Sequence, residues 1–229
     1  MTDEETLEAF RLADSFLPVG TYAVSYGLEQ FVQDERVSNA GDLSALLSTY
    51  LRQQVGPADL VALRAAHAAG SARDVEAACR ADRRLTAATL AAEFRESARS
   101  AGGRLVSLQR DLRDEELLER YAERVDDGDT PGNHAVVLGL VTGSAGVPAR
   151  TACLLHCHGF VTGLLGAAQR LLPLGHTDAQ RVLDGLKPVI ADAVEDSADR
   201  PLDSMAPFAP LVDVLSAEHE RADRRLFSS

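Results

Sequence analysis

A cluster of cysteine and histidine is the part of the sequence best suited to chemistry. The segment CLLHCHGF, residues 153 to 160, places Cys153, His156 and Cys157 at i, i+3 and i+4, a spacing that brings three side chains to one face of a helix. One interpretation is a metal site of three soft ligands in a small metal-binding protein or metalloenzyme. The other is a buried helix face, because free cysteine packs as a small hydrophobe and Phe160 follows on that face. We favour burial, so we expect no resident metal and no cofactor.

Nucleotide and nucleophilic chemistry have weaker support. A P-loop needs a glycine-rich turn followed by Lys and Ser or Thr, and the single lysine of this chain, Lys187, precedes Pro188. The stretch GTYAVSYG, residues 20 to 27, lacks G-x-G-x-x-G spacing, and no G-x-S-x-G elbow occurs. We therefore expect no catalytic residue and no enzyme activity in this chain.

Composition limits the partners and the compartment. The chain has 229 residues, 35 of them acidic and 23 basic, for a net charge of -12. Such a surface repels phosphate backbones and anionic lipid, so nucleic acid and membranes are not expected partners. Three cysteines form no disulfide framework, and the first 20 residues lack a signal-peptide pattern, so we expect a cytoplasmic protein. The longest apolar runs are shorter than the roughly 20 residues that span a bilayer.

Helical periodicity predicts an all-α fold, a single-domain array of about eight to ten helices over residues 1–229. A capping box at Thr2 and Glu5 begins the first helix, which runs toward Asp14. Gly56-Pro57 predicts a break between two helices, and Gly102-Gly103 predicts an interruption of another.

The second half of the chain is organised around a clear loop. The stretch VDDGDTPGN, residues 125 to 133, supplies turn geometry and little to bury. Helices are expected after it from about 134 to 144, 149 to 172 and 177 to 194. Residues 196–210 contain three prolines and are predicted to be an irregular connector, and residues 219–229 are predicted to be a mobile C-terminal tail.

Two segments suit partner binding. The stretch LADSFLPVGTYAVSYGLEQFV, residues 12 to 32, interrupts a helix with a loop that would present Tyr22 and Ser25; the alternative is a plain helix junction with Tyr22 packed inward. The tail contains Arg225, Leu226 and Phe227, which are either part of a frayed end or the anchors of a segment that binds a partner.

Four blocks of the sequence resemble the UreF family of urease accessory proteins, in the family's order. They are LADSFLPVGTYAVSYGLE at 12 to 29, GNHAVVLGLVTGSAGVP at 132 to 148, RLLPLGHTDAQRVL at 170 to 183, and HERADRRLFSS at 219 to 229. The first and last are specific, whereas the middle two would be weak alone. The residues that match family positions are Tyr22, His134, Gly139, His219, Glu220 and Arg225. The chain departs from the family pattern at LLHCHGF, so Cys153 and Cys157 are interpreted as a local feature.

The resemblance implies an all-α homodimer that assists nickel insertion into urease. It implies no enzyme activity, and it implies partners: the UreD scaffold, also called UreH, the GTPase UreG, and through them the urease apoprotein. The chain would bridge scaffold and GTPase and modulate the GTPase. The residues implied in partner binding are Tyr22, Ser25, His134, Gly139, His219, Glu220, Arg225, Leu226 and Phe227.

Overall fold

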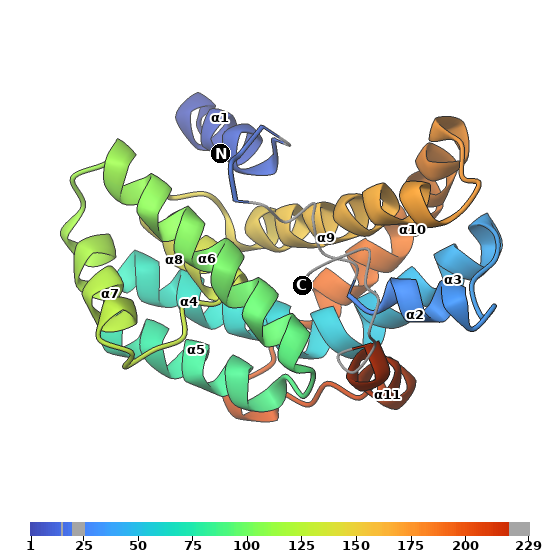
Figure 1. The fold of residues 1–229 in the computed structure, drawn as a ribbon. Coiled ribbons are helices and arrows are strands. Elements are labelled where there is room, and N and C mark those ends of the chain that lie inside the picture. Colours follow the sequence, from blue (N-terminus) through green and yellow to red (C-terminus); the bar gives the residue numbers. More distant parts are fainter. Residues whose placement is uncertain (15, 20–25, 220–229) are drawn as a thin grey trace.

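The computed structural model describes residues 1–14, 16–19 and 26–219. Helices joined by short loops make up these ranges, which contain no β-strand, so the all-α prediction is confirmed (Figure 1). The helices are α1 (Asp3–Ala13), α2 (Leu28–Gln33), α3 (Ala40–Tyr50), the π-helix η2 (Leu51–Leu60), α4 (Val61–Ala72), α5 (Val75–Ala88), α6 (Ala92–Leu112), α7 (Glu116–Asp126), α8 (His134–Ser144), α9 (Ala149–Leu171), α10 (His176–Asp196), the 3-10 turn η3 (Leu202–Ser204) and α11 (Pro210–His219).

The pair α4 and α8 forms the centre of the molecule, and it is the most extensive helix contact in the described ranges. The two helices approach closely because glycines line the contact. A Cβ on Gly139 of α8 would overlap the carbonyl oxygen of Leu63, and a Cβ on Gly143 would overlap that of His67. Gly139 therefore has a packing role within this chain.

The predicted break at Gly56-Pro57 is wrong, because the chain continues from α3 through η2 into α4 as one helical path. Proline has no N–H to donate within a helix. The segment that contains Pro57 is a π-helix, in which each N–H pairs with the carbonyl five residues earlier. The N–H of Phe208 donates to the Gln53 carbonyl at 2.9 Å, so the segment before α11 is tied to this helix.

The predicted interruption at Gly102-Gly103 is also wrong, since both residues lie inside α6. A Cβ on Gly102 would overlap the carbonyl oxygen of Gly132, whereas a Cβ on Gly103 would meet no described atom within 4 Å. Gly102 is therefore explained by the close passage of the loop that precedes α8, and this tertiary contact outweighs the poor helix propensity of glycine.

The loop before α8 is held by one buried carboxylate, that of Asp82 on α5. Asp82 accepts hydrogen bonds from the hydroxyls of Tyr121 and Thr130, from the backbone N–H groups of Gly132 and Asn133, and from the Asn133 side-chain amide. These contacts fix the point at which α8 begins.

The helix α9 is long and apolar enough to cross a membrane by length and composition alone, although the sequence predicted no such segment. Half of its most apolar window is buried within the protein, against α10, α8, α1 and other helices. Several α9 residues, among them Cys153, Val161 and Leu164, belong to the buried hydrophobic core.

Candidate functional site

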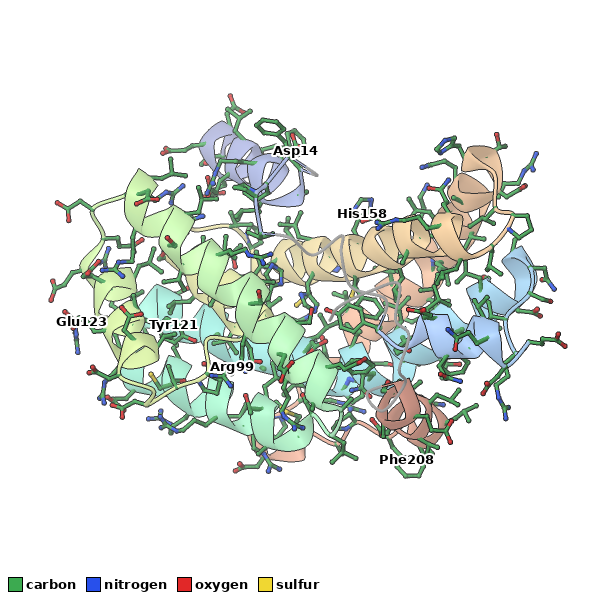
Figure 2. All side chains as sticks on the ribbon, in the orientation of Figure 1. Asp14, Arg99, Tyr121, Glu123, His158 and Phe208 are labelled. Atoms are coloured by element: carbon green, nitrogen blue, oxygen red, sulfur yellow. The ribbon has the colours of Figure 1, made fainter. Side chains whose placement is uncertain are left out.

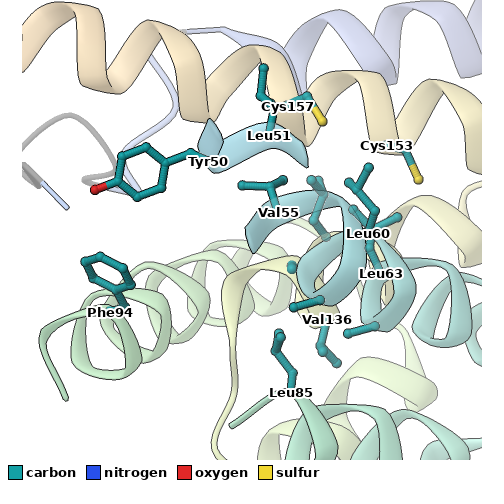
Figure 3. Close-up of a cluster of buried hydrophobic side chains, with 14 of the residues drawn as sticks. Tyr50, Leu51, Val55, Leu60, Leu63, Leu85, Phe94, Val136, Cys153 and Cys157 are labelled. Atoms are coloured by element: carbon teal, nitrogen blue, oxygen red, sulfur yellow. The ribbon is translucent and has the colours of Figure 1, made fainter. Parts of the chain in front are cut away.

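The cysteines of the predicted metal site lie in the hydrophobic core. Cys153 and Cys157 are fully buried, and Figure 3 shows both thiols on the side of α9 that faces Leu51 and Leu60. Burial raises the pKa of Cys153 to about 11 and also raises the pKa of Cys157, so both stay protonated at neutral pH. Protonated thiols are poor metal ligands.

The structure does not assemble the alternative metal site. Within residues 1–14, 16–19 and 26–219, no group of three or more His, Cys, Asp or Glu side chains has an arrangement that could hold a metal ion. The favoured interpretation, a buried helix face, agrees with the packing of Cys153 and Cys157.

His156 instead faces a polar position between three helices. Its side chain is only 10% exposed, and its Nε2 lies 3.5 Å from a carboxylate oxygen of Asp59 on η2, too far for a good hydrogen bond. Its ring stacks on that of His134, with centroids 5.8 Å apart. Neither ring nitrogen of His156 finds a hydrogen-bond partner among the described residues, and the same holds for the Oε1 atom of Gln54. Unpaired polar atoms in an interior are costly, so these three atoms mark the position as unusual.

An aromatic cluster adjoins the two histidines. The ring of Tyr26 lies 5.1 Å from those of Phe94 and Phe160, and the ring of Tyr50 lies 5.7 Å from that of Phe160, measured between centroids. The Tyr50 hydroxyl donates to the carbonyl of Tyr26. Burial, reinforced by the charge of Asp59, raises the pKa of Tyr26 to about 12, so the phenol is neutral.

Two small cavities flank this cluster and share Tyr26, His134, His156 and Phe160 in their walls. The first, of about 60 Å³, lies toward α1 and is lined largely by apolar side chains. The second, of about 50 Å³, lies toward η2, and the side chains of Gln54 and Asp59 contribute to its wall. We call this second space the η2 cavity.

His134 begins α8 and is part of both cavities. Burial, assisted by the neighbouring His156, lowers its pKa to about 3, so the imidazole is neutral at pH 7. Gly139 lies one and a half turns further along α8, inside the contact with α4. That either residue contacts a partner stays a prediction, and the buried position of Gly139 already accounts for its glycine.

Most of the other predicted partner-binding residues lie outside the described residues: Tyr22, Ser25, Glu220, Arg225, Leu226 and Phe227. His219 is the last residue of α11. Predictions for these positions therefore stay predictions.

The structure adds two exposed apolar surfaces that the sequence analysis missed. On α1, Leu7 and Phe10 are about two-thirds exposed, while Glu8 on the inner side pairs with Arg113. Near α11, the exposed apolar side chains are Phe208, Leu211 and Val214. The spacing of apolar residues along these helices was visible in the sequence, but it does not show which apolar side chains pack against the rest of the chain and which stay exposed.

The sequence analysis also did not predict which residues form the site of aromatic and histidine side chains. Tyr26, Asp59 and Gln54 come from segments that are distant from α9 in sequence, and nothing local connects them. The sequence analysis had singled out His134, His156 and Phe160 for other reasons, and it did not connect them with one another in this site.

Comparison with known proteins identifies relatives of the whole chain. The profile of the UreF family matches residues 37–187. The urease accessory protein UreF of Trichodesmium erythraeum is 33% identical over 225 residues, covering 98% of this chain and 97% of that protein. UreF 1 of Brucella melitensis is 33% identical over 221 residues, covering 96% and 91%, and UreF of Bacillus sp. strain TB-90 is 28% identical over 223 residues, covering 97% and 98%. The chain belongs to the UreF family of urease accessory proteins.

Proposed function

We propose that this chain assists nickel insertion into urease by bridging the UreD/UreH scaffold and the GTPase UreG, and by modulating that GTPase. The observation that carries the proposal is the similarity to urease accessory proteins over nearly the full length of the chain. Membership of the UreF family implies both roles, bridging and modulation, for this chain. The only lysine precedes a proline, so the nucleotide chemistry belongs to the GTPase and the chain acts without catalysis.

The positions of the exposed apolar surfaces support a bridging role, because a bridge needs two separate docking faces. The helices α1 and α11 lie on opposite sides of the molecule in Figure 1. Figure 2 shows Phe208 beside α11 at the edge away from Asp14, which follows α1. Exposed apolar surface of this kind is typical of protein interaction sites.

The α11 surface is the proposed site for the scaffold. It leads directly into residues 219–229, where His219, Glu220, Arg225, Leu226 and Phe227 match or adjoin the family's terminal motif. Arginine offers a planar set of donors to a carboxylate or carbonyl, and burial of each apolar anchor contributes about 1.5–3 kcal/mol. Tyr22, Ser25 and His134 are proposed as further partner contacts.

The test is reconstitution of urease activation from purified components. Deletion of 219–229, or Arg225→Ala, should leave helicity and melting temperature unchanged while weakening capture of the scaffold and lowering the nickel content and activity of urease. A matched control is Leu112→Ser, which changes an exposed apolar residue of α6 outside both surfaces. Unfolding of the truncated chain would place the tail in the core, and capture at full strength would refute the docking role.

The family resemblance also supports a homodimer in the cytoplasm. Light scattering on the purified chain, combined with fractionation of cells, tests both statements. A monomer at micromolar concentration, or recovery in the membrane fraction, would contradict them.

A further inference from the structure

The described residues that line the η2 cavity include one carboxylate and two histidines. Asp59 contributes to its wall, and no lysine or arginine does so among the described residues. The remaining titratable groups of the wall are Tyr26, Tyr50, His134 and His156. Of the two histidines in the wall, His156 has its Nε2 3.5 Å from the Asp59 carboxylate, and it makes no hydrogen bond there. The described wall therefore offers Asp59 no lysine or arginine as an ion-pair partner.

The accessible charged acceptor of the wall is the Asp59 carboxylate, whose side chain is 28% exposed. Gln54 Oε1 and the two ring nitrogens of His156 also lack a hydrogen-bond partner among the described residues, but these three atoms are fully buried behind the wall. A group with N–H donors in the cavity would therefore pair with the Asp59 carboxylate.

The apolar part of the wall is aromatic. Tyr26, Tyr50, Phe94 and Phe160 all contribute to the η2 cavity, with neighbouring ring centroids 5.1 to 5.7 Å apart. The faces of aromatic rings attract cations, and the attraction grows when water is excluded. An aromatic wall and an accessible carboxylate are two separate observations that favour the same ligand class.

We propose that the η2 cavity receives a cationic head group, namely the guanidinium of an arginine side chain supplied by a protein partner. Guanidinium is planar, weakly hydrated and rich in donors, and it stacks on aromatic rings, so it fits this wall better than an ammonium group. A volume of about 50 Å³ admits a head group, with the aliphatic stem leading out toward the surface. The inference rests on the proposed function only for the source of the arginine, a protein partner.

The first test is an NMR titration of the isolated chain. The probes are the peptide Ac-Ala-Ala-Arg-Ala-Ala-amide, the same peptide with citrulline, a neutral isostere, in place of arginine, and methylguanidinium. The arginine peptide should shift the ring resonances of Tyr26 and His156, and the citrulline peptide should bind at least about tenfold more weakly, a difference of about 1.4 kcal/mol. Equal binding of both peptides, or no shift with arginine, would overturn the proposal. Methylguanidinium binding as tightly as the peptide would overturn the assignment to a protein side chain.

Variants locate the binding. Asp59→Asn keeps the shape of the side chain and should weaken arginine peptide binding about tenfold. Phe160→Leu keeps an apolar side chain without a π face and should weaken it severalfold. Asp184→Asn is the matched control, because it removes an exposed carboxylate of α10 that pairs with Lys187, and it should change nothing. If Asp59→Asn does not fold, Phe160→Leu and the citrulline comparison still decide the question. Unchanged affinity in folded Asp59→Asn would place the peptide elsewhere and refute the proposal.

The same variants separate this inference from the proposed function. Folded Asp59→Asn should capture the scaffold or the GTPase less well than the wild-type chain does. If the wild-type chain captures neither protein and does not activate urease, the proposed function fails, whatever the peptide titration shows. If the wild-type chain activates urease but binds no arginine peptide, only the cation site fails.

Discussion

Removal of the Asp82 carboxylate should destabilise the protein more than any surface change. The carboxylate is fully buried, and it accepts five hydrogen bonds. Those from Tyr121 and Thr130 are 2.8 Å long, those from the backbone N–H groups of Gly132 and Asn133 are 2.6 and 2.9 Å, and that from the Asn133 amide is 2.6 Å. The donors come from α7 and from the loop before α8, so one side chain joins three parts of the fold.

The expected loss follows from the donors that would remain. Each buried donor left unpaired costs about 1–3 kcal/mol, and water entering the space vacated by the side chain would recover part of the sum. We expect Asp82→Ala to lower the free energy of unfolding by about 3–5 kcal/mol, a large share of the roughly 5–15 kcal/mol of a typical domain. Asp82→Asn should lower the free energy of unfolding by less, about 2–4 kcal/mol. Asparagine keeps one acceptor oxygen, but its NH₂ group would face N–H and O–H donors and leave some of them unpaired.

Urea unfolding followed by circular dichroism measures this directly. The midpoint should fall with little change in the slope of the transition. Asp184→Ala is the control, because its carboxylate is exposed, and it should unfold at the wild-type midpoint. A free energy of unfolding for Asp82→Ala within about 1 kcal/mol of wild type would refute the assignment of Asp82 as the anchor of this loop.

Further predictions concern packing, the thiols and pH. Gly139→Ala should lower the free energy of unfolding by about 1–3 kcal/mol, because its Cβ would overlap the backbone of α4. Gly166→Ala is the control and should be neutral or stabilising, because a Cβ there meets no described atom within 4 Å. Equal denaturation midpoints for the two variants would contradict this prediction. The double variant Cys153→Ala and Cys157→Ala leaves small cavities, so its free energy of unfolding should fall by about 1–3 kcal/mol, and it should still activate urease. A folded double variant that yields nickel-free urease would support metal binding instead. The pKa of His134 is about 3 in the folded chain and about 6.5 when unfolded, so the unfolded state binds more protons between these two pH values. The free energy of unfolding should therefore fall on acidification, by about 1–2 kcal/mol from pH 7 to pH 5, and His134→Gln should make it less dependent on pH. If urea titrations show the same pH dependence in His134→Gln as in the wild-type chain, the buried neutral imidazole is refuted.

Local sequence features predicted local structure well. The capping box at Thr2 and Glu5 is present, with the Glu5 N–H donating to the Thr2 hydroxyl at 3.2 Å. The predicted helix from 134 to 144 agrees with α8. Such features depend on residues that are only three or four positions apart, so a short stretch of sequence contains all the residues that determine them.

Glycine and proline misled the prediction where distant contacts dominate. Gly102 marks the close passage of Gly132, and Pro57 lies inside a π-helix whose Gln53 carbonyl accepts a hydrogen bond from the N–H of Phe208. In both cases the partner lies far along the chain. A pattern within one segment cannot distinguish such a residue from a helix breaker.

The sequence by itself determined the helical class, the family and the absence of a P-loop, because composition, periodicity and motif spacing are properties of the linear chain. Tertiary structure alone decided what surrounds His156. The i, i+3, i+4 spacing allowed it to share a site with Cys153 and Cys157, but the cysteines pack into the core and His156 meets His134 and Asp59. The physical reason is that burial of apolar surface fixes which side of α9 faces the core, and residues from distant helices then determine which polar groups meet at its edge.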